Sequence, residues 1–316
     1  MKNIALQILN IMKVDNMYIL NKIIKYPKKT LEQSLKEVMK SKNRMISGKY
    51  SPTIFSMNYE EVKYKSIDGL NLYGWYIKRS NEPKNTILLL HGRNNNRIFC
   101  LKFLQIFSEI DKENKYNIFI PDLRNSGKSD EAMTAFGYFF ARDIYSSMKM
   151  LNERYKLNNF VLYGFSQGGM GAAICSKLFQ KELSEENIKI SKMILDSPVS
   201  NIQKIILHHS KIKDYTIPKV FLIPSFIALN KIVDKNLKKL RLSELLGDIP
   251  TLLLQSKKDK LTPFRIIEKE YFNLDDEKKE KVRFKAFRKG QHVRIYLEYK
   301  EEYTQTINKF LESEKI

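Results

Sequence analysis

The sequence of 316 residues predicts an α/β fold built on a mostly parallel, doubly wound sheet. First, several short apolar runs lack the alternation of a half-exposed strand, which is typical of parallel strands buried on both faces. Second, segments of helical length separate most of these runs, as βαβ units require. Third, an alternating segment with one turn precedes the first run and predicts an antiparallel N-terminal hairpin at the edge of the sheet.

Each element follows from the local pattern. The hairpin is expected where Tyr59, Val62 and Tyr64 lead to a turn at Asp68-Gly69. The buried strands are expected at residues 86–90, 117–120, 160–163, 193–195, 251–254 and 282–286. The helices between them are expected near residues 98–112, 141–155, 168–181, 263–272 and 294–314. Residues 51–316 are therefore expected to form one α/β domain.

One connection is much longer than a normal crossover, because about fifty residues separate Asp196 from Ile249. This insertion, at about residues 197–249, is rich in Ile, Leu, Val and Phe, with Pro218 and Pro224 expected to break its helices. An apolar insertion of this length has to bury itself. We therefore expect a small helical cap over the carboxyl edge of the sheet, where open α/β sheets bind ligands.

Residues 1–50 are expected to form a helical extension. They carry 11 basic and 3 acidic side chains, and the apolar residues among the first twelve fit an amphipathic helix. Two outcomes remain open at this stage. The extension either docks on the domain, as most amphipathic faces do, or makes peripheral contact with an anionic membrane surface.

Composition limits the possible partners. The formal net charge of +21 comes from 56 basic and 35 acidic residues, but 44 of the basic residues are lysines scattered along the chain. Without an Arg-rich tract or a groove-reading motif, we expect no nucleic-acid binding. No apolar stretch is long enough to span a bilayer. Cys100 and Cys175 form neither a disulfide framework nor a metal cluster, which fits buried residues of a cytoplasmic protein.

The strongest chemical motif is Gly164-Phe165-Ser166-Gln167-Gly168, between a predicted strand and a predicted helix. A turn this sharp leaves no room for side chains at its two outer positions, so both are glycine. The turn lifts the hydroxyl of Ser166 out of the sheet, and the helix that follows directs its positive dipole end toward developing negative charge. Ser166 is therefore the candidate nucleophile.

A serine needs a base to take its proton, and the chain has four histidines. His292 follows the last predicted strand and precedes the last helix, the place that suits a base in the order Ser, Asp, His. His91 directly follows a strand upstream of the serine, so a loop-shaping role is expected for it. His208 and His209 lie in the predicted cap.

Two carboxylates compete to orient the imidazole. Asp259 follows the penultimate strand in a polar loop, and Asp196 follows the strand before it. We favour Asp259 because its strand directly precedes the strand leading to His292, so the two loops should be neighbours. Asp196 precedes Ser197-Pro198, where a carboxylate can brace the turn. Asp122 is expected to brace a loop.

The runs LLLHG, PDLRNSGKS, YGFSQGG, TLLLQSKKDKLTP and KGQH resemble the α/β-hydrolase superfamily in order and spacing, over roughly residues 57–312. Within it, the chain looks like the Bem46-like, serine-aminopeptidase-like branch of serine hydrolases. The resemblance implies a triad of Ser166, Asp259 and His292, and an oxyanion hole formed by the backbone N–H groups of Arg93 and Gln167. The polar run RNNNR after His91-Gly92 departs from the family pattern.

The resemblance implies acyl transfer without a metal or cofactor. A carboxylic ester is the expected substrate because the cap is apolar and suits an acyl chain. A peptide or a thioester could use the same triad, and a non-catalytic binding protein on this scaffold is a further alternative. We also consider whether Arg93 and Arg97 face the cleft and select anionic substrates, or are solvated loop charges.

Overall fold

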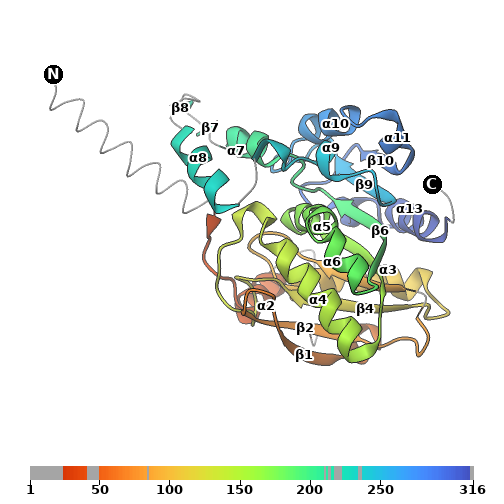
Figure 1. Cartoon of the computed structure of the whole chain (residues 1–316). Coiled ribbons are helices and arrows are strands. Elements are labelled where there is room, and N and C mark those ends of the chain that lie inside the picture. Colours follow the sequence, from red (N-terminus) through yellow and green to blue (C-terminus); the bar gives the residue numbers. More distant parts are fainter. Residues whose placement is uncertain are drawn as a thin grey trace, which may run out of the picture.

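The computed structural model describes residues 24–40, 50–83, 85–209, 211–212, 215–216, 223–233 and 237–313. An eight-stranded sheet with the strand order β1-β2-β4-β3-β5-β6-β9-β10 forms the centre of the molecule (Figure 1). Its strands are β1 (Glu60–Lys65), β2 (Asn71–Ile77), β3 (Asn85–Leu90), β4 (Tyr116–Asp122), β5 (Asn159–Phe165), β6 (Lys189–Asp196), β9 (Thr251–Ser256) and β10 (Val282–Phe287). β2 pairs antiparallel with β1 and β4, and the other neighbours are parallel. The predicted fold class is confirmed.

Most helices outside the insertion lie close to their predicted positions: α3 (Arg97–Ile110), α4 (Phe140–Tyr155), α5 (Gln167–Leu178), α6 (Gln180–Glu185), α10 (Phe264–Phe272), α12 (Ile295–Glu298) and α13 (Lys300–Glu312). α2 (Leu31–Lys40) lies in the N-terminal extension, and the short helix α11 (Asp276–Glu280) was not predicted. Two predicted helices are each divided. α5 and α6 meet at Phe179, and α12 and α13 meet at Tyr299, where the backbone leaves helical angles. Apolar periodicity continues across such a break, so the sequence pattern does not reveal it.

The sheet is covered on both faces (Figure 1). Leu88 and Leu90 of β3 pack with α4 and α5 on one face. Ile87 and Leu89 of the same strand pack with α3 and α13 on the other. Successive side chains of a strand point to opposite faces, so a strand buried on both sides is apolar at every position. This is why the predicted runs do not alternate.

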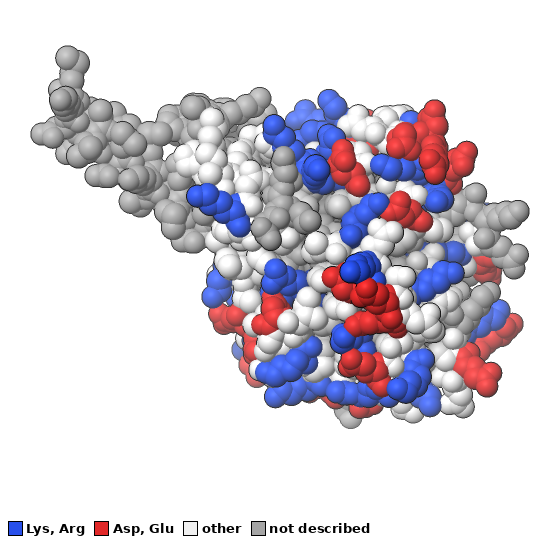
Figure 2. Space-filling model, in the orientation of Figure 1, with Lys and Arg blue, Asp and Glu red and all other residues white. Residues whose placement is uncertain are grey.

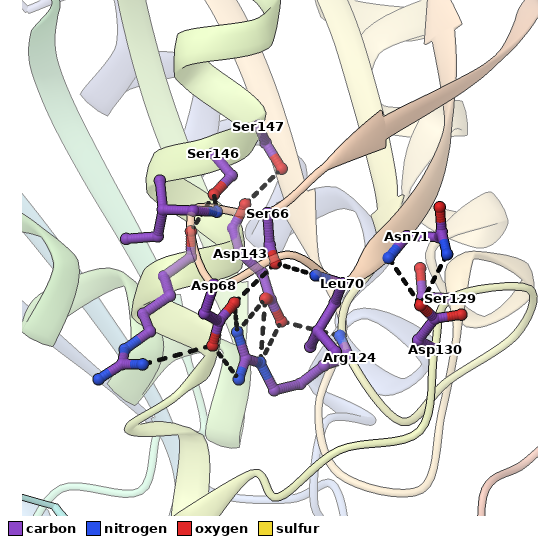
Figure 3. A network of polar contacts seen from close by, with 12 residues as sticks. Ser66, Asp68, Leu70, Asn71, Arg124, Ser129, Asp130, Asp143, Ser146 and Ser147 are labelled. Atoms are coloured by element: carbon purple, nitrogen blue, oxygen red, sulfur yellow. Dashed lines mark hydrogen bonds and ion pairs between the residues drawn. The ribbon is translucent and has the colours of Figure 1, made fainter.

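The N-terminal hairpin turns where the sequence predicts, with Gly69 at a φ of 87° that an L side chain rarely adopts. The turn is anchored to the loop after β4 (Figure 3). Arg124 donates to Asp68 at 2.9 Å and to Asp143 of α4 at 2.7 Å. Arg124 is 3% exposed, so this buried bidentate network fixes the loop that follows β4.

The long insertion contains more than helices. It includes α7 (Ile202–His209), α8 (Ile223–Ile232), the short pair β7 (Lys211–Ile212) and β8 (Tyr215–Thr216), and α9 (Leu242–Leu245). Pro224 does not break a helix as expected, because it lies in the first turn of α8, where proline is tolerated. Pro218 lies outside the described residues. Ile205 and Ile206 are buried as expected, whereas Ile223 and Ile227 of α8 are about half exposed.

Part of the N-terminal extension docks on the domain. The N–H of Thr134 donates to the carbonyl of Ile24, and the N–H of Gly127 donates to that of Lys29. The predicted amphipathic helix of the first twelve residues lies outside the described residues, so membrane contact by residues 1–50 stays a prediction. Within the described ranges, every helix is too short or too polar to cross a bilayer. Lys and Arg side chains are interspersed with Asp and Glu on the face shown in Figure 2.

Candidate active site

Ser166 stands on the sharp turn between β5 and α5. Its backbone is at φ 55° and ψ −118°, a strained conformation for a residue with a side chain. A Cβ built on Gly164 would lie 2.6 Å from the Cα of Gly169, and one on Gly168 would lie 2.3 Å from the carbonyl oxygen of Leu90. Only glycine fits both positions. The two glycines of the motif therefore let the chain turn tightly enough to present the Ser166 hydroxyl.

The structure brings three of the predicted site residues together. Nε2 of His292 lies 2.9 Å from Oγ of Ser166, and Nδ1 of His292 lies 2.8 Å from Oδ2 of Asp259. Because an ionised carboxylate only accepts hydrogen bonds, Nδ1 carries the proton and Nε2 is left to accept from the serine. The side chain of His292 is 17% exposed and that of Asp259 is fully buried.

Besides His292, several other donors fix the carboxylate of Asp259. Its Oδ1 accepts from the N–H groups of Leu261 at 2.8 Å and Thr262 at 2.9 Å. Its Oδ2 accepts from the hydroxyl of Thr262 at 2.8 Å and from the side-chain amide of Gln255 at 3.2 Å. Burial alone would raise the pKa of Asp259, but His292 and these donors hold it below its ordinary value. The group is therefore an anion at neutral pH.

Thr262 is a site residue that the sequence analysis did not identify. Its hydroxyl also lies 3.2 Å from Nδ1 of His292 and donates weakly to the carbonyl of Ser197. The only available signal was its position three residues after Asp259, the spacing of a side chain that bonds back to a carboxylate in a turn.

Asp196 faces a different set of partners. It is fully buried, accepts from the hydroxyl of Tyr303 at 2.6 Å, and accepts from Oγ of Ser197 at 2.8 Å. Burial raises its pKa, and the hydrogen bonds from Tyr303 and Ser197 offset this only in part. Oγ of Ser197 in turn accepts from the N–H of Val293, next to His292. Asp196 thus braces the loops beneath the histidine instead of contacting its ring.

His91 has the loop-shaping position expected of it. Its Nε2 accepts from the N–H of Leu123 at 3.0 Å, so the ring proton is on Nδ1, which donates to the carbonyl of Gly92 at 2.8 Å. A Cβ built on Gly92 would lie 3.5 Å from Oγ of Ser166. His91 therefore sets the path of the chain directly beside the candidate nucleophile.

The His91 ring is expected to stay neutral well below the pH at which free histidine protonates. Burial lowers its pKa from 6.5 to about 4. Between these values the unfolded chain binds the proton and the folded one does not, so the free energy of unfolding should fall by up to ~3 kcal/mol as pH drops. Nitrogen NMR shifts of the imidazole should report an Nδ1–H tautomer at pH 5.5. An ordinary pKa near 6.5 at this ring would contradict the assignment.

The two arginines do not both face the cleft. Arg97 is fully buried, pairs with Glu61 at 2.6 Å and Asp122 at 3.4 Å, and lies over the ring of Trp75. Arg97 therefore neither faces the cleft nor is a solvated loop charge. Its positive charge lies in the core, where it pairs with Asp122. Asp122 also accepts from the N–H of Arg97, so it braces this loop as predicted.

The two proposed oxyanion donors flank Ser166. Gln167 is the first residue of α5, so its N–H has no carbonyl partner within the helix. Arg93 follows Gly92, the residue whose backbone approaches Oγ of Ser166. The guanidinium of Arg93 lies 4.7 Å from the ring centre of Tyr26. The side chain thus packs on the N-terminal segment, while the backbone runs beside the serine.

The insertion contacts the loop that carries Asp259. Nε2 of His208 lies 3.1 Å from the carbonyl oxygen of Lys260, and Nε2 of His209 lies 2.8 Å from that of Leu261. The end of α7 is thereby tied to the rim of the site. Within the described ranges, no cluster of three or more His, Cys, Asp or Glu residues could hold a metal ion.

Comparisons with known proteins agree with this architecture. A family model described as alpha/beta hydrolase fold matches residues 85–212. The uncharacterized protein YqkD of Bacillus subtilis is 22% identical over 259 residues, which cover 78% of this chain and 76% of that protein. The uncharacterized protein YfhR of Escherichia coli O157:H7 is 27% identical over 228 residues, covering 70% of each chain.

Two solved structures are similar over most of the chain. The esterase Pf2001 of Pyrococcus furiosus superposes with a TM-score of 0.63 at 21% identity and covers 84% of this chain and 95% of its own. The esterase EaEST of Exiguobacterium antarcticum superposes with a TM-score of 0.53 at 21% identity, over 80% of this chain and 100% of its own. With the strand order and the turn at Ser166, these similarities identify the α/β-hydrolase fold in this protein.

Proposed function

We propose that the protein is a serine hydrolase that cleaves carboxylic esters through an acyl-enzyme on Ser166. The observation that carries this proposal is the continuous chain of hydrogen bonds from Asp259 through His292 to Oγ of Ser166. In this arrangement a buried anion orients a neutral imidazole, and the imidazole accepts the proton of the serine. The esterases of similar fold support the same class of chemistry.

The mechanism follows from the positions of the proton donors and acceptors. Nε2 of His292 takes the proton of Ser166 as Oγ attacks the ester carbonyl carbon. The backbone N–H groups of Arg93 and Gln167 hold the oxyanion of the tetrahedral intermediate. The C–O bond then breaks, and the leaving alkoxide takes the proton from His292. A water molecule repeats these steps to release the acid and regenerate Ser166.

A carboxylic ester is the favoured substrate, because the insertion beside the site is apolar and suits an acyl chain. As a further part of the proposal, the insertion at about residues 197–249 is the cap of a domain comprising residues 51–316. The motifs also favour the Bem46-like branch. A peptidase, a thioesterase or a non-catalytic binding protein on the same fold are the competing outcomes.

Labelling by a fluorophosphonate followed by a substrate panel tests the proposal. Ser166 is expected to be labelled, because Nε2 of His292 lies where it can accept the proton of the serine hydroxyl. Short and long acyl esters, acyl thioesters and aminoacyl amides are then compared by kcat/KM. Esters should give the highest values. No labelling and no turnover would indicate a binding protein, and preference for amides or thioesters would reassign the leaving group.

A further inference from the structure

We propose that residues 24–34, the N-terminal strap, position the 91–96 loop so that the backbone N–H of Arg93 remains directed at the substrate oxyanion. This inference rests on the function proposed above and adds positioning residues to it. The strap precedes residues 85–212, which the family model matches. Its contacts with the loop and with the rest of the domain carry the inference.

The strap is anchored to the loop that follows β4. The side-chain amide of Asn125 donates to the carbonyl of Tyr26 at 2.6 Å, and Asn125 is fully buried. The N–H of Gly127 donates to the carbonyl of Lys29 at 2.9 Å. Arg124, which directly precedes Asn125, is held by its ion pairs with Asp68 and Asp143 (Figure 3). The strap therefore rests on a fixed base.

The strap also holds the end of the 91–96 loop. The side-chain amide nitrogen of Asn96 lies 2.8 Å from Oγ of Ser34, 3.1 Å from the carbonyl oxygen of Thr30 and 3.3 Å from that of Lys29. The same side chain accepts from the N–H of Ile98 and so caps α3. One fully buried residue thus joins the strap, the loop and the start of a helix.

The middle of the loop is held by an aromatic contact. The guanidinium of Arg93 lies 4.7 Å from the ring centre of Tyr26, which is 5% exposed. Burial raises the pKa of Tyr26 to about 12, so the contact is a cation–π interaction with a neutral ring.

The contact between Tyr26 and Arg93 lies in a part of the loop where a small displacement of the Arg93 backbone N–H would slow catalysis. The loop starts at His91, which is bound to Leu123, and ends at Asn96, which is bound to the strap. Arg93 and Asn94 between them form a turn, with Asn94 at a φ of 55°. Loss of the Tyr26 ring removes one contact that holds the Arg93 side chain and lets the adjoining peptide move. Because the oxyanion exists only after attack, such movement should lower kcat and leave KM nearly unchanged.

The test compares Tyr26→Ala and Tyr26→Phe in the full chain with the ester that the wild type cleaves best. We expect kcat to fall at least about tenfold in Tyr26→Ala, because displacing a catalytic group by about 1 Å can cost a hundredfold. Tyr26→Phe keeps the ring over Arg93 and should retain a kcat near that of the wild type. The affinity for a trifluoromethyl ketone, whose adduct with serine carries the same oxyanion, should weaken in parallel with kcat/KM.

Controls separate positioning from loss of folding. Lys25→Ala is matched because Lys25 lies in the strap but points to solvent toward Glu131 at 3.6 Å, and it should behave as the wild type. Thermal unfolding followed by circular dichroism sets an assay temperature at which each variant is folded. A lower melting temperature with unchanged kcat and ketone affinity would overturn the inference.

A second variant keeps the test decisive if Tyr26→Ala does not fold. Arg93→Ala removes the guanidinium from the other side of the contact and preserves the backbone N–H. The same loss of kcat is expected, and wild-type kcat in this variant would refute the strap's role. If the wild type is neither labelled by a fluorophosphonate nor active on any ester, the proposed function itself fails. An active wild type with fully active variants rejects the strap alone.

Discussion

Replacement of Ser166 by alanine is expected to lower ester hydrolysis by on the order of 10⁶-fold in kcat, because no other group can form the acyl-enzyme. The fold should remain intact, since alanine keeps the Cβ and adds no strain at φ 55° beyond that of serine. Turnover of an ester and fluorophosphonate labelling measure the change, and circular dichroism checks the fold.

Ser176→Ala provides a matched control for this substitution. Ser176 lies in α5, the helix that follows Ser166, and its hydroxyl donates to the carbonyl of Ala173 at 2.9 Å. Loss of that bond should leave turnover within about twofold of the wild type, as expected for a residue whose hydroxyl bonds only within its helix. Activity of Ser166→Ala near the wild-type level would show that another residue is the nucleophile.

Asp259→Asn is expected to reduce kcat by ~10⁴-fold, because an amide at this position favours the tautomer with the proton on Nε2 of His292. That nitrogen then has no lone pair to take the serine proton. Asp259→Asn should therefore be labelled slowly by a fluorophosphonate, although Ser166 is intact. The backbone N–H groups of Leu261 and Thr262 keep Oδ1 as their acceptor, so the variant should fold.

Asp196→Asn is the discriminating comparison, because both carboxylates follow neighbouring strands. Asparagine keeps only one acceptor oxygen, so the hydroxyl of either Tyr303 or Ser197 loses its acceptor, and the free energy of unfolding should fall by about 1–3 kcal/mol. Turnover should fall far less than in Asp259→Asn. If Asp196→Asn abolishes turnover and Asp259→Asn does not, the third member of the proposed triad is wrong.

Much of the fold could be predicted because its causes are local. The continuous apolar runs of β3 and β5 follow from burial on both faces, and the strands begin and end within a few residues of the predicted bounds. The turn at Ser166 is only partly local, since a side chain at Gly164 would clash with Gly168 and Gly169, whereas one at Gly168 would clash with Leu90 and His91 at the end of the adjacent strand β3. The divisions at Phe179 and Tyr299 were not predicted, because apolar periodicity runs through them.

The sequence by itself determined the fold class, the candidate nucleophile and the two carboxylates that could orient its base. Only the tertiary structure decided that Asp259, and not Asp196, contacts His292, and that Arg97 lies in the core beside Asp122. It also placed Tyr26 against Arg93, across more than sixty residues of chain. Apolar periodicity acts over a few residues and leaves a pattern in the sequence. Ion pairs and ring contacts form between whichever groups the packing of distant segments brings within a few ångströms, and chain spacing does not encode that distance.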